Sequence, residues 1–190
     1  AHYLSHMGAT GAVAIDRVKS DGQGSETIWS GTWGPGWSHF MPFEFAGQAH
    51  YLSYKAGTGA AAIDRVKPDG RGSDTVWSGN WSPGWTHFMP FELAGQAHYL
   101  SYMGATGAAA IDRVRPDGRG SDTIWSGRWG PGWSHFMPFE LAGQAHYLSY
   151  QASTGAVAID RFRPDGQGSD TICNDTWTPD WIHFMPFTLV

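Results

Sequence analysis

The side chains with the clearest chemical potential in this sequence are tryptophans that recur in groups of three. Trp77, Trp81 and Trp85 are spaced four residues apart, and the pattern is repeated elsewhere in the chain. An indole ring offers a flat apolar face and one N–H donor. Such a ring stacks on the C–H face of a pyranose and leaves nearby polar groups to bind its hydroxyls. The tryptophans therefore predict repeated carbohydrate sites.

The predicted sugar-binding residues lie near the ends of strands and in the loops that follow them. A role in the core is the alternative for each one, and we favour the core for Trp85 and its copies because they lie inside a strand. Amide, hydroxyl and guanidinium groups beside the remaining rings complete the predicted sites. The predicted set is Trp29, Trp77, Trp125, Trp33, Trp81, Trp129, Trp177, Tyr54, Tyr102, Tyr150, Asn80 and Arg128.

Histidines also recur, at two positions of each repeat. A ring of histidines around a central channel could bind a metal, but no second ligand follows at a short metal-binding spacing. We therefore expect hydrogen-bonded histidines inside each sheet, no metal site and no cofactor. These residues are His39, His87, His135 and His183 in one position and His2, His50, His98 and His146 in the other.

The charged residues and the single cysteine suggest structure rather than catalysis. The repeated Asp-Arg pair, such as Asp112-Arg113, has side chains on opposite faces of a strand, and we expect it to bridge to a neighbouring unit. Residues 69–74 lack the ligand spacing of a calcium loop. Cys173 stands where the other copies have tryptophan. No phosphate-binding glycine motif or nucleophile elbow is present, so the sequence predicts a protein without enzymatic activity.

These residues are organised by an internal repeat. The tryptophans at positions 37, 85, 133 and 181 recur every 48 residues, and a repeat of this length must be identified before any other structural prediction. The units are residues 37–84, 85–132 and 133–180, with a fourth made of 1–36 and 181–190. The chain therefore begins and ends inside one unit. We expect a single domain, residues 1–190, in which the terminal strands pair and close a ring.

Each unit contains the signals of four short strands. In the second unit these are residues 85–93, 97–102, 108–114 and 122–126, separated by an Ala-Gly turn, a glycine loop and a Pro-Asp-Gly turn. No segment has a helical period. Four strands per unit predict an all-β, four-bladed β-propeller. Two stacked sheets or a ring built from several chains remain alternatives, and four-fold repetition disfavours a β-trefoil.

Composition excludes some functions and leaves others open. The 190 residues include 26 glycines and 15% aromatic residues, and the formal net charge is −5. There is no basic surface for nucleic acid, and no apolar segment is long enough to insert into a membrane. One cysteine cannot form an internal disulfide. The sequence fits a cytoplasmic protein or one secreted without disulfides, and it leaves homo-oligomerisation open.

The segments Gly36-Trp-Ser-His-Phe-Met-Pro-Phe43 and Gly84-Trp-Thr-His-Phe-Met-Pro-Phe91, each followed by a turn and a Tyr-Leu strand, resemble the blade motif of the tachylectin-type propeller lectins. The resemblance covers about twenty of every 48 residues. It implies a propeller with repeated sites for sugars, often N-acetylated ones. This chain departs from that family in having four units, so individual ligand residues cannot be transferred.

The expected function is multivalent carbohydrate binding, with glycans or glycoconjugates as partners and weak sites strengthened by repetition. The fourth copy diverges at residues 173–180, so its site is expected to be altered. The alternative is a hemopexin-like four-bladed scaffold that binds an ion or a protein partner without catalysis. A structural or storage protein without a ligand is a third alternative.

Overall fold

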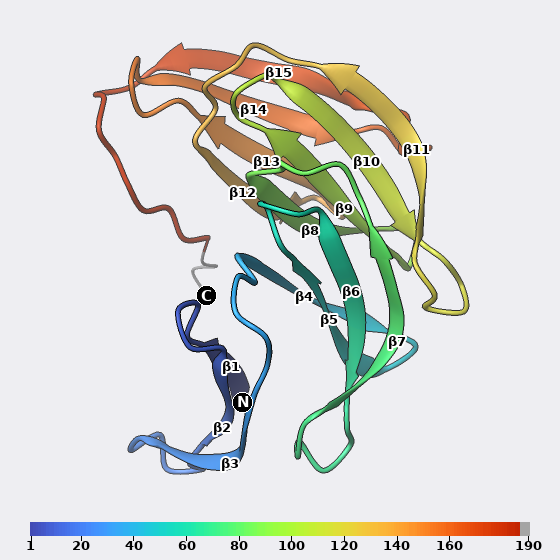
Figure 1. Cartoon of the computed structure of the whole chain (residues 1–190). Helices are drawn as coiled ribbons and strands as arrows, with labels where there is room; N and C mark the ends of the chain where they lie inside the picture. The colour runs from blue at the N-terminus through green and yellow to red at the C-terminus, as the bar shows by residue number, and fades with distance from the viewer. Residues whose placement is uncertain (187–190) are drawn as a thin grey trace. The chain divides into compact units, whose positions relative to one another are not determined.

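A computed structural model describes residues 1–186 of the chain, and these residues are organised as antiparallel sheets (Figure 1). They form fifteen strands and no helix, and therefore no helix that could span a membrane. The strands are β1 (His2–His6), β2 (Ala12–Val18), β3 (Ser25–Thr32), β4 (His39–Phe45), β5 (Gln48–Tyr54), β6 (Ala60–Val66), β7 (Ser73–Asn80), β8 (His87–Leu93), β9 (Gln96–Met103), β10 (Ala108–Val114), β11 (Ser121–Arg128), β12 (His135–Leu141), β13 (Gln144–Tyr150), β14 (Ala156–Phe162) and β15 (Ser169–Thr176).

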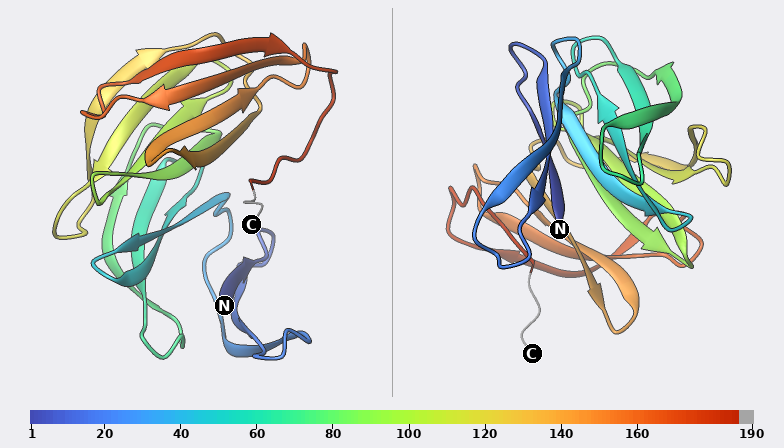
Figure 2. Two further views of the ribbon diagram at one scale, coloured as in Figure 1. Left: turned by 180° about the vertical axis from the view of Figure 1, so that it is seen from behind. Right: turned by 90° about the horizontal axis from the view of Figure 1, so that it is seen from below.

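The strands form four sheets in which sequence neighbours pair. Three sheets have four strands, in the orders β4-β5-β6-β7, β8-β9-β10-β11 and β12-β13-β14-β15, and the sheet β1-β2-β3 has three. Figure 2 shows the chain from behind and from below, and both views show strands and no helix. The all-β, four-sheet part of the prediction is thus confirmed. No strand follows β15 among the described residues, so the predicted pairing of the chain ends is not observed.

The chain divides into two compact units. One comprises Ala1–Gly84 together with Gly118–Gly120, and the other comprises Trp85–Asp117 and the chain from Ser121 onward. The first contains the sheets that begin with β1 and β4, and the second contains those that begin with β8 and β12. The prediction of one domain for all four repeats stays a prediction.

Repeated turn residues explain why equivalent turns recur from sheet to sheet. The β8–β9 hairpin turns at Ala94 and Gly95, which both have positive φ (49° and 73°). That backbone is a type I′ turn, whose twist matches the flanking strands. Gly59 permits a different close approach, because a Cβ there would lie 1.9 Å from the Trp81 carbonyl oxygen. The Trp81 N–H donates to the Gly59 carbonyl over 2.8 Å.

The core of the second unit lies between its two sheets. Met89, Leu100 and Ile111 on one sheet pack with Tyr147 and Phe162 on the other. All five side chains are buried. The strand β8 lies against β12 and β13, so the first strands of consecutive sheets are neighbours. Ala109 on β10 belongs to the same buried cluster.

Candidate functional site

The predicted sugar-stacking rings Trp33 and Trp129 lie between consecutive sheets rather than in solvent. Trp33 stacks on Tyr51 with 5.7 Å between ring centroids and on His6 with 5.9 Å. Trp129 stacks in the same way on Tyr102 (5.9 Å) and Tyr147 (6.0 Å). Neighbouring rings therefore cover part of each indole. Both side chains stay partly exposed, so the prediction that they bind a ligand stays a prediction beside their packing role.

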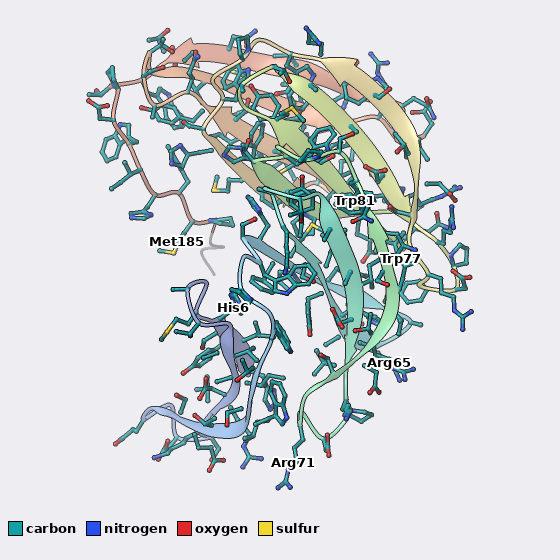
Figure 3. All side chains as sticks on the ribbon, in the orientation of Figure 1. His6, Arg65, Arg71, Trp77, Trp81 and Met185 are labelled. Carbon is teal, nitrogen blue, oxygen red and sulfur yellow. The ribbon has the colours of Figure 1, made fainter. Side chains whose placement is uncertain are left out.

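The predicted residues Trp29, Trp77 and Trp125 also have structural partners. A Cβ added to the glycine two residues later in each strand would lie 2.5–2.8 Å from the indole ring, so each ring lies over its own strand. The indole of Trp77 lies 6.0 Å from that of Trp81 (Figure 3). Gly72 would contact the Trp29 ring at 3.2 Å if it carried a Cβ. These glycines therefore recur with the tryptophans because they make room for them.

The predicted tyrosines are unavailable to a ligand. Tyr54, Tyr102 and Tyr150 are fully buried, and each hydroxyl donates a hydrogen bond of 2.8 Å to a backbone carbonyl. Their assignment as sugar-binding residues is therefore corrected. Asn80 and Arg128 are exposed at the ends of β7 and β11, and Trp177 has an exposed fraction of 38%. Predicted rings of one repeat do come together, since Trp129 packs on both Tyr102 (5.9 Å) and Trp125 (6.1 Å).

The repeated histidines form hydrogen bonds, as the sequence predicted. The Nδ1 atom of His98 lies 2.8 Å from the Gln96 carbonyl oxygen, and burial lowers the pKa of His98. His87 contacts the Thr86 hydroxyl and the Ser134 carbonyl. Among residues 1–186, no three His, Cys, Asp or Glu side chains come close enough to hold a metal ion. The histidines thus tie backbone segments together within and between sheets.

The Asp-Arg pairs are structural, but they do not bridge neighbouring sheets as predicted. Asp112 accepts a hydrogen bond of 2.6 Å from the Thr123 hydroxyl on the adjacent strand, and burial raises the pKa of this carboxyl. Arg65 forms an ion pair with Asp74 on the strand beside its own. Both contacts lie inside one sheet because the antiparallel register places these residues close together. Cys173 is exposed on the outer strand β15.

A pocket in the second unit brings together two carboxylates that the sequence did not identify as a site. Glu92 lies near the end of β8 and Glu140 near the end of β12, and both line a cavity of about 500 Å³. Both side chains are exposed. Phe91, Pro138 and Phe139 line its walls, and the turn glycines 95 and 143 line its rim. The sequence feature that could have identified this pocket is the Phe-Glu pair near the end of the first strand in successive repeats.

A larger groove of about 1030 Å³ lies in the first unit. Its walls come from two consecutive sheets and include Leu4 and Ile15 on one side and Tyr51 and Val66 on the other. His50 also lines the groove, and its Nδ1 atom lies 2.9 Å from the Gln48 carbonyl oxygen. Its ring stacks on Phe43 with 5.6 Å between centroids. The groove is mainly apolar where the two sheets face each other.

No family model and no curated protein matches the sequence. Solved structures do match. The periplasmic gluconolactonase of Pseudomonas aeruginosa aligns with a TM-score of 0.62 at 12% identity, over 94% of this chain and 52% of its own. A Bacteroides fragilis protein described as a 6-phosphogluconolactonase gives 0.63 at 13%, over 92% and 53%. A protein from Lactobacillus plantarum gives 0.63 at 10%, over 92% and 54%.

These neighbours establish a propeller-like all-β fold and correct the predicted function. This chain spans about half the length of each, and identities of 10–13% show the fold alone. Those with a named activity are lactonases, which are hydrolases. The lactonase names of these neighbours contradict the predictions of a lectin, of a hemopexin-like scaffold and of a protein without enzymatic activity, and an activity of this chain itself is a proposal. The tachylectin-type resemblance, the glycan partners, the expected lack of nucleic-acid binding and the possible homo-oligomer stay predictions, since no comparison addresses them.

Proposed function

We propose that this chain is a hydrolase that opens a sugar-derived lactone, and that the reaction takes place in the pocket lined by Glu92 and Glu140. The observation that carries the proposal is the presence of two carboxylates in one pocket. The cavity of about 500 Å³ lies within the range of roughly 300–1,000 Å³ that is usual for small-molecule sites. Lactonase names among structures of similar fold support the choice of substrate class.

The chemistry of lactone opening requires a base and an acid. One carboxylate removes a proton from water, and the water oxygen attacks the lactone carbonyl carbon. The ring C–O bond then breaks, and the oxygen that leaves takes a proton from the other carboxyl group. The product is an open-chain hydroxy acid. Glu92 and Glu140 can share these two roles because they come from equivalent positions of neighbouring strands and line the same pocket.

The walls of the pocket suit a ring-shaped polar substrate. Phe91 and Phe139 provide apolar surface for the C–H face of a sugar ring, in the way that aromatic rings commonly do. The rim is formed by hairpin turns, in which Gly95 and Gly143 carry no side chain that would block entry. The substrate would therefore lie against the aromatic walls with its carbonyl carbon toward the carboxylates.

The test measures lactone hydrolysis by the purified protein and by Glu92→Gln and Glu140→Gln variants. Glucono-δ-lactone and its 6-phosphate are the probes, and the spontaneous rate in buffer is subtracted. Loss of a general base or acid should lower kcat about 10²–10⁴-fold. The matched control is Glu44→Gln, which changes the same Phe-Glu sequence on β4 and should leave the rate unchanged. Full activity in both pocket variants would refute the site.

We also propose that the four sheets are blades of a closed ring built from 48-residue repeats. Support comes from the equivalent strand order of the sheets and from the three-stranded sheet β1-β2-β3. The other three sheets each begin with a strand of sequence His-Phe-Met-Pro-Phe, and the same sequence begins at His183. A strand from the C-terminal segment would complete the sheet that contains β1.

A further inference from the structure

The pocket that contains Glu92 and Glu140 is negatively charged. These two carboxylates are the only ionisable side chains among the described residues that line it, and the other lining residues are Phe, Pro, Ala and Gly. No Lys, Arg or His belongs to this lining. An ionised carboxylate accepts hydrogen bonds and donates none. The pocket therefore offers a substrate negative charge, apolar walls and hydrogen-bond acceptors.

The negative charge extends over the whole second unit. That unit carries ten Asp and Glu side chains against five Arg side chains, and it has no Lys. The first unit carries seven acidic and seven basic side chains, so its formal side-chain charge is zero. The formal net charge of −5 therefore belongs entirely to the unit that holds the pocket.

The arginines of the sheet that begins with β8 do not offset the charge of the pocket. Arg115 forms an ion pair of 2.8 Å with Asp122 on β11, and Arg113 lies opposite the same aspartate in the ladder. Arg128 pairs with residue 108, at the opposite end of this sheet from the Gly95 turn that lines the pocket. An aspartate or distance thus separates each of these positive charges from the carboxylates.

The sheet that begins with β12 repeats this arrangement. Asp170 on its outer strand β15 lies 2.8 Å from Arg163 and 3.9 Å from Arg161. One carboxylate therefore faces both guanidinium groups of this sheet. Neither arginine lines the pocket, so neither provides the positive charge that an anionic substrate would need there.

A phosphate group requires features that this pocket lacks. A phosphate ester carries about −1.5 to −2 charges at pH 7, and its oxygens accept hydrogen bonds. Proteins commonly bind it with Arg, Lys or the N-terminus of a helix. Residues 1–186 form no helix, and the described lining has no positive side chain. The hydroxyl groups of an unphosphorylated sugar lactone, in contrast, are donors that carboxylates accept.

We propose that the pocket selects neutral, polyhydroxylated lactones and discriminates against their phosphate esters. This inference rests on the proposed lactone hydrolysis and specifies the substrate class of the same site. Both carboxylates are exposed, so Coulomb repulsion is calculated with the dielectric constant of water. At about 8 Å, each pair of unit negative charges weakens binding about 2.4-fold. A phosphate dianion therefore binds about 6-fold more weakly beside one ionised carboxylate, and about 30-fold beside two.

The first test compares the KM values of glucono-δ-lactone and its 6-phosphate at low and high salt. At about 0.01 M salt we expect KM to be about 6–30-fold higher for the 6-phosphate. The Debye length falls from about 30 Å at 0.01 M to about 3 Å at 1 M. The KM of the 6-phosphate should therefore fall as salt is added, whereas that of the neutral lactone should stay constant.

A charge-insertion variant tests the same repulsion at constant salt. Gln144→Arg places a positive charge beside Gly143 on the rim, at a residue that is exposed. It should lower the KM of the 6-phosphate about 6-fold at low salt and leave that of the neutral lactone unchanged. The matched control is Gln48→Arg, at the equivalent position of the β4–β5 hairpin in the first unit, which should change neither value.

The outcomes separate this inference from the function on which it rests. Equal KM values at low salt, or a lower value for the 6-phosphate, would overturn the substrate class and leave lactone hydrolysis standing. A Gln144→Arg variant that binds the 6-phosphate no better than the natural chain would also overturn it. Hydrolysis of neither lactone by the folded protein would contradict the proposed function itself, and this inference with it.

Discussion

The indole of Trp129 stacks on the phenol ring of Tyr147 in the next sheet, with 6.0 Å between ring centroids and 20° between planes. Tyr147 is almost completely buried, and its hydroxyl lies 2.7 Å from that of Ser169. The contact joins two consecutive sheets through aromatic surface. A residue type that suits sugar binding thus holds the sheets together at this position.

Replacing this tryptophan should therefore destabilise the protein. We expect Trp129→Ala to lower the free energy of unfolding by about 3–5 kcal/mol, because the indole leaves a cavity between two sheets. Trp177→Ala is the matched control at the same repeat position, where the ring is 38% exposed and packs on Tyr150 and Phe184. Its cost should be about 1–2 kcal/mol. Urea unfolding monitored by circular dichroism measures both; equal costs would contradict the packing role.

The half-buried carboxyl of Asp112 should make stability depend on pH. Burial raises its pKa, which the Thr123 hydrogen bond lowers in part and the charge of Asp122 raises further. An unfolded aspartate has a pKa of about 3.9. Above that pH the folded state binds more protons than the unfolded state, so stability falls as pH rises until the folded carboxyl is fully ionised. The contribution of the Asp112 carboxyl to the free energy of unfolding is therefore most favourable at low pH.

The variant Asp112→Asn tests this dependence. An asparagine oxygen can still accept the Thr123 hydrogen bond but carries no charge. The stability of the variant relative to the natural sequence should increase as pH rises above about 4 and then level off. His98, whose pKa burial lowers, acts in the opposite direction below about pH 6.5, but it is common to both proteins and cancels in the difference. A difference that is constant between pH 3 and pH 8 would argue against a raised pKa.

The hairpin turn of β4 and β5 should be open to stabilisation. Ala46 has a φ of 50° and Gly47 a φ of 70°. Left-handed backbone costs an ordinary residue about 1–2 kcal/mol, and asparagine tolerates it better. We expect Ala46→Asn to raise the free energy of unfolding by about 1 kcal/mol. Ala49→Asn, three residues later in β5, is the control and should give no gain, since asparagine is disfavoured in strands.

Strand positions could be predicted well from the sequence, because turn residues and alternation repeat in every unit. The strand expected at 108–114 is β10, and that expected at 97–102 differs from β9 by one residue at each end. The strand expected from Trp85 begins instead at His87. There Thr86 lies outside the ladder, and its hydroxyl contacts both His87 and the Tyr102 carbonyl.

The candidate site could not be predicted in the same way. Residue type alone does not tell which rings lie inside a sheet packing, and the sequence therefore predicts a ligand contact for Tyr54, which is fully buried. Glu92 and Glu140 were missed because an exposed acid in a strand usually belongs to a solvated face. Only the packing of β8 against β12 places them in one pocket. Contacts between repeats are therefore the information that the pattern of one repeat lacks.

The most direct measurement is titration of the acid released when the purified chain is mixed with glucono-δ-lactone at constant pH. The proposed function predicts that the rate of acid release above the buffer blank rises in proportion to protein concentration and saturates with substrate. It also predicts that the excess rate disappears when Glu92 and Glu140 are both replaced by glutamine. A rate equal to the blank for folded protein, with either lactone, would contradict the proposal that this chain is a lactone hydrolase.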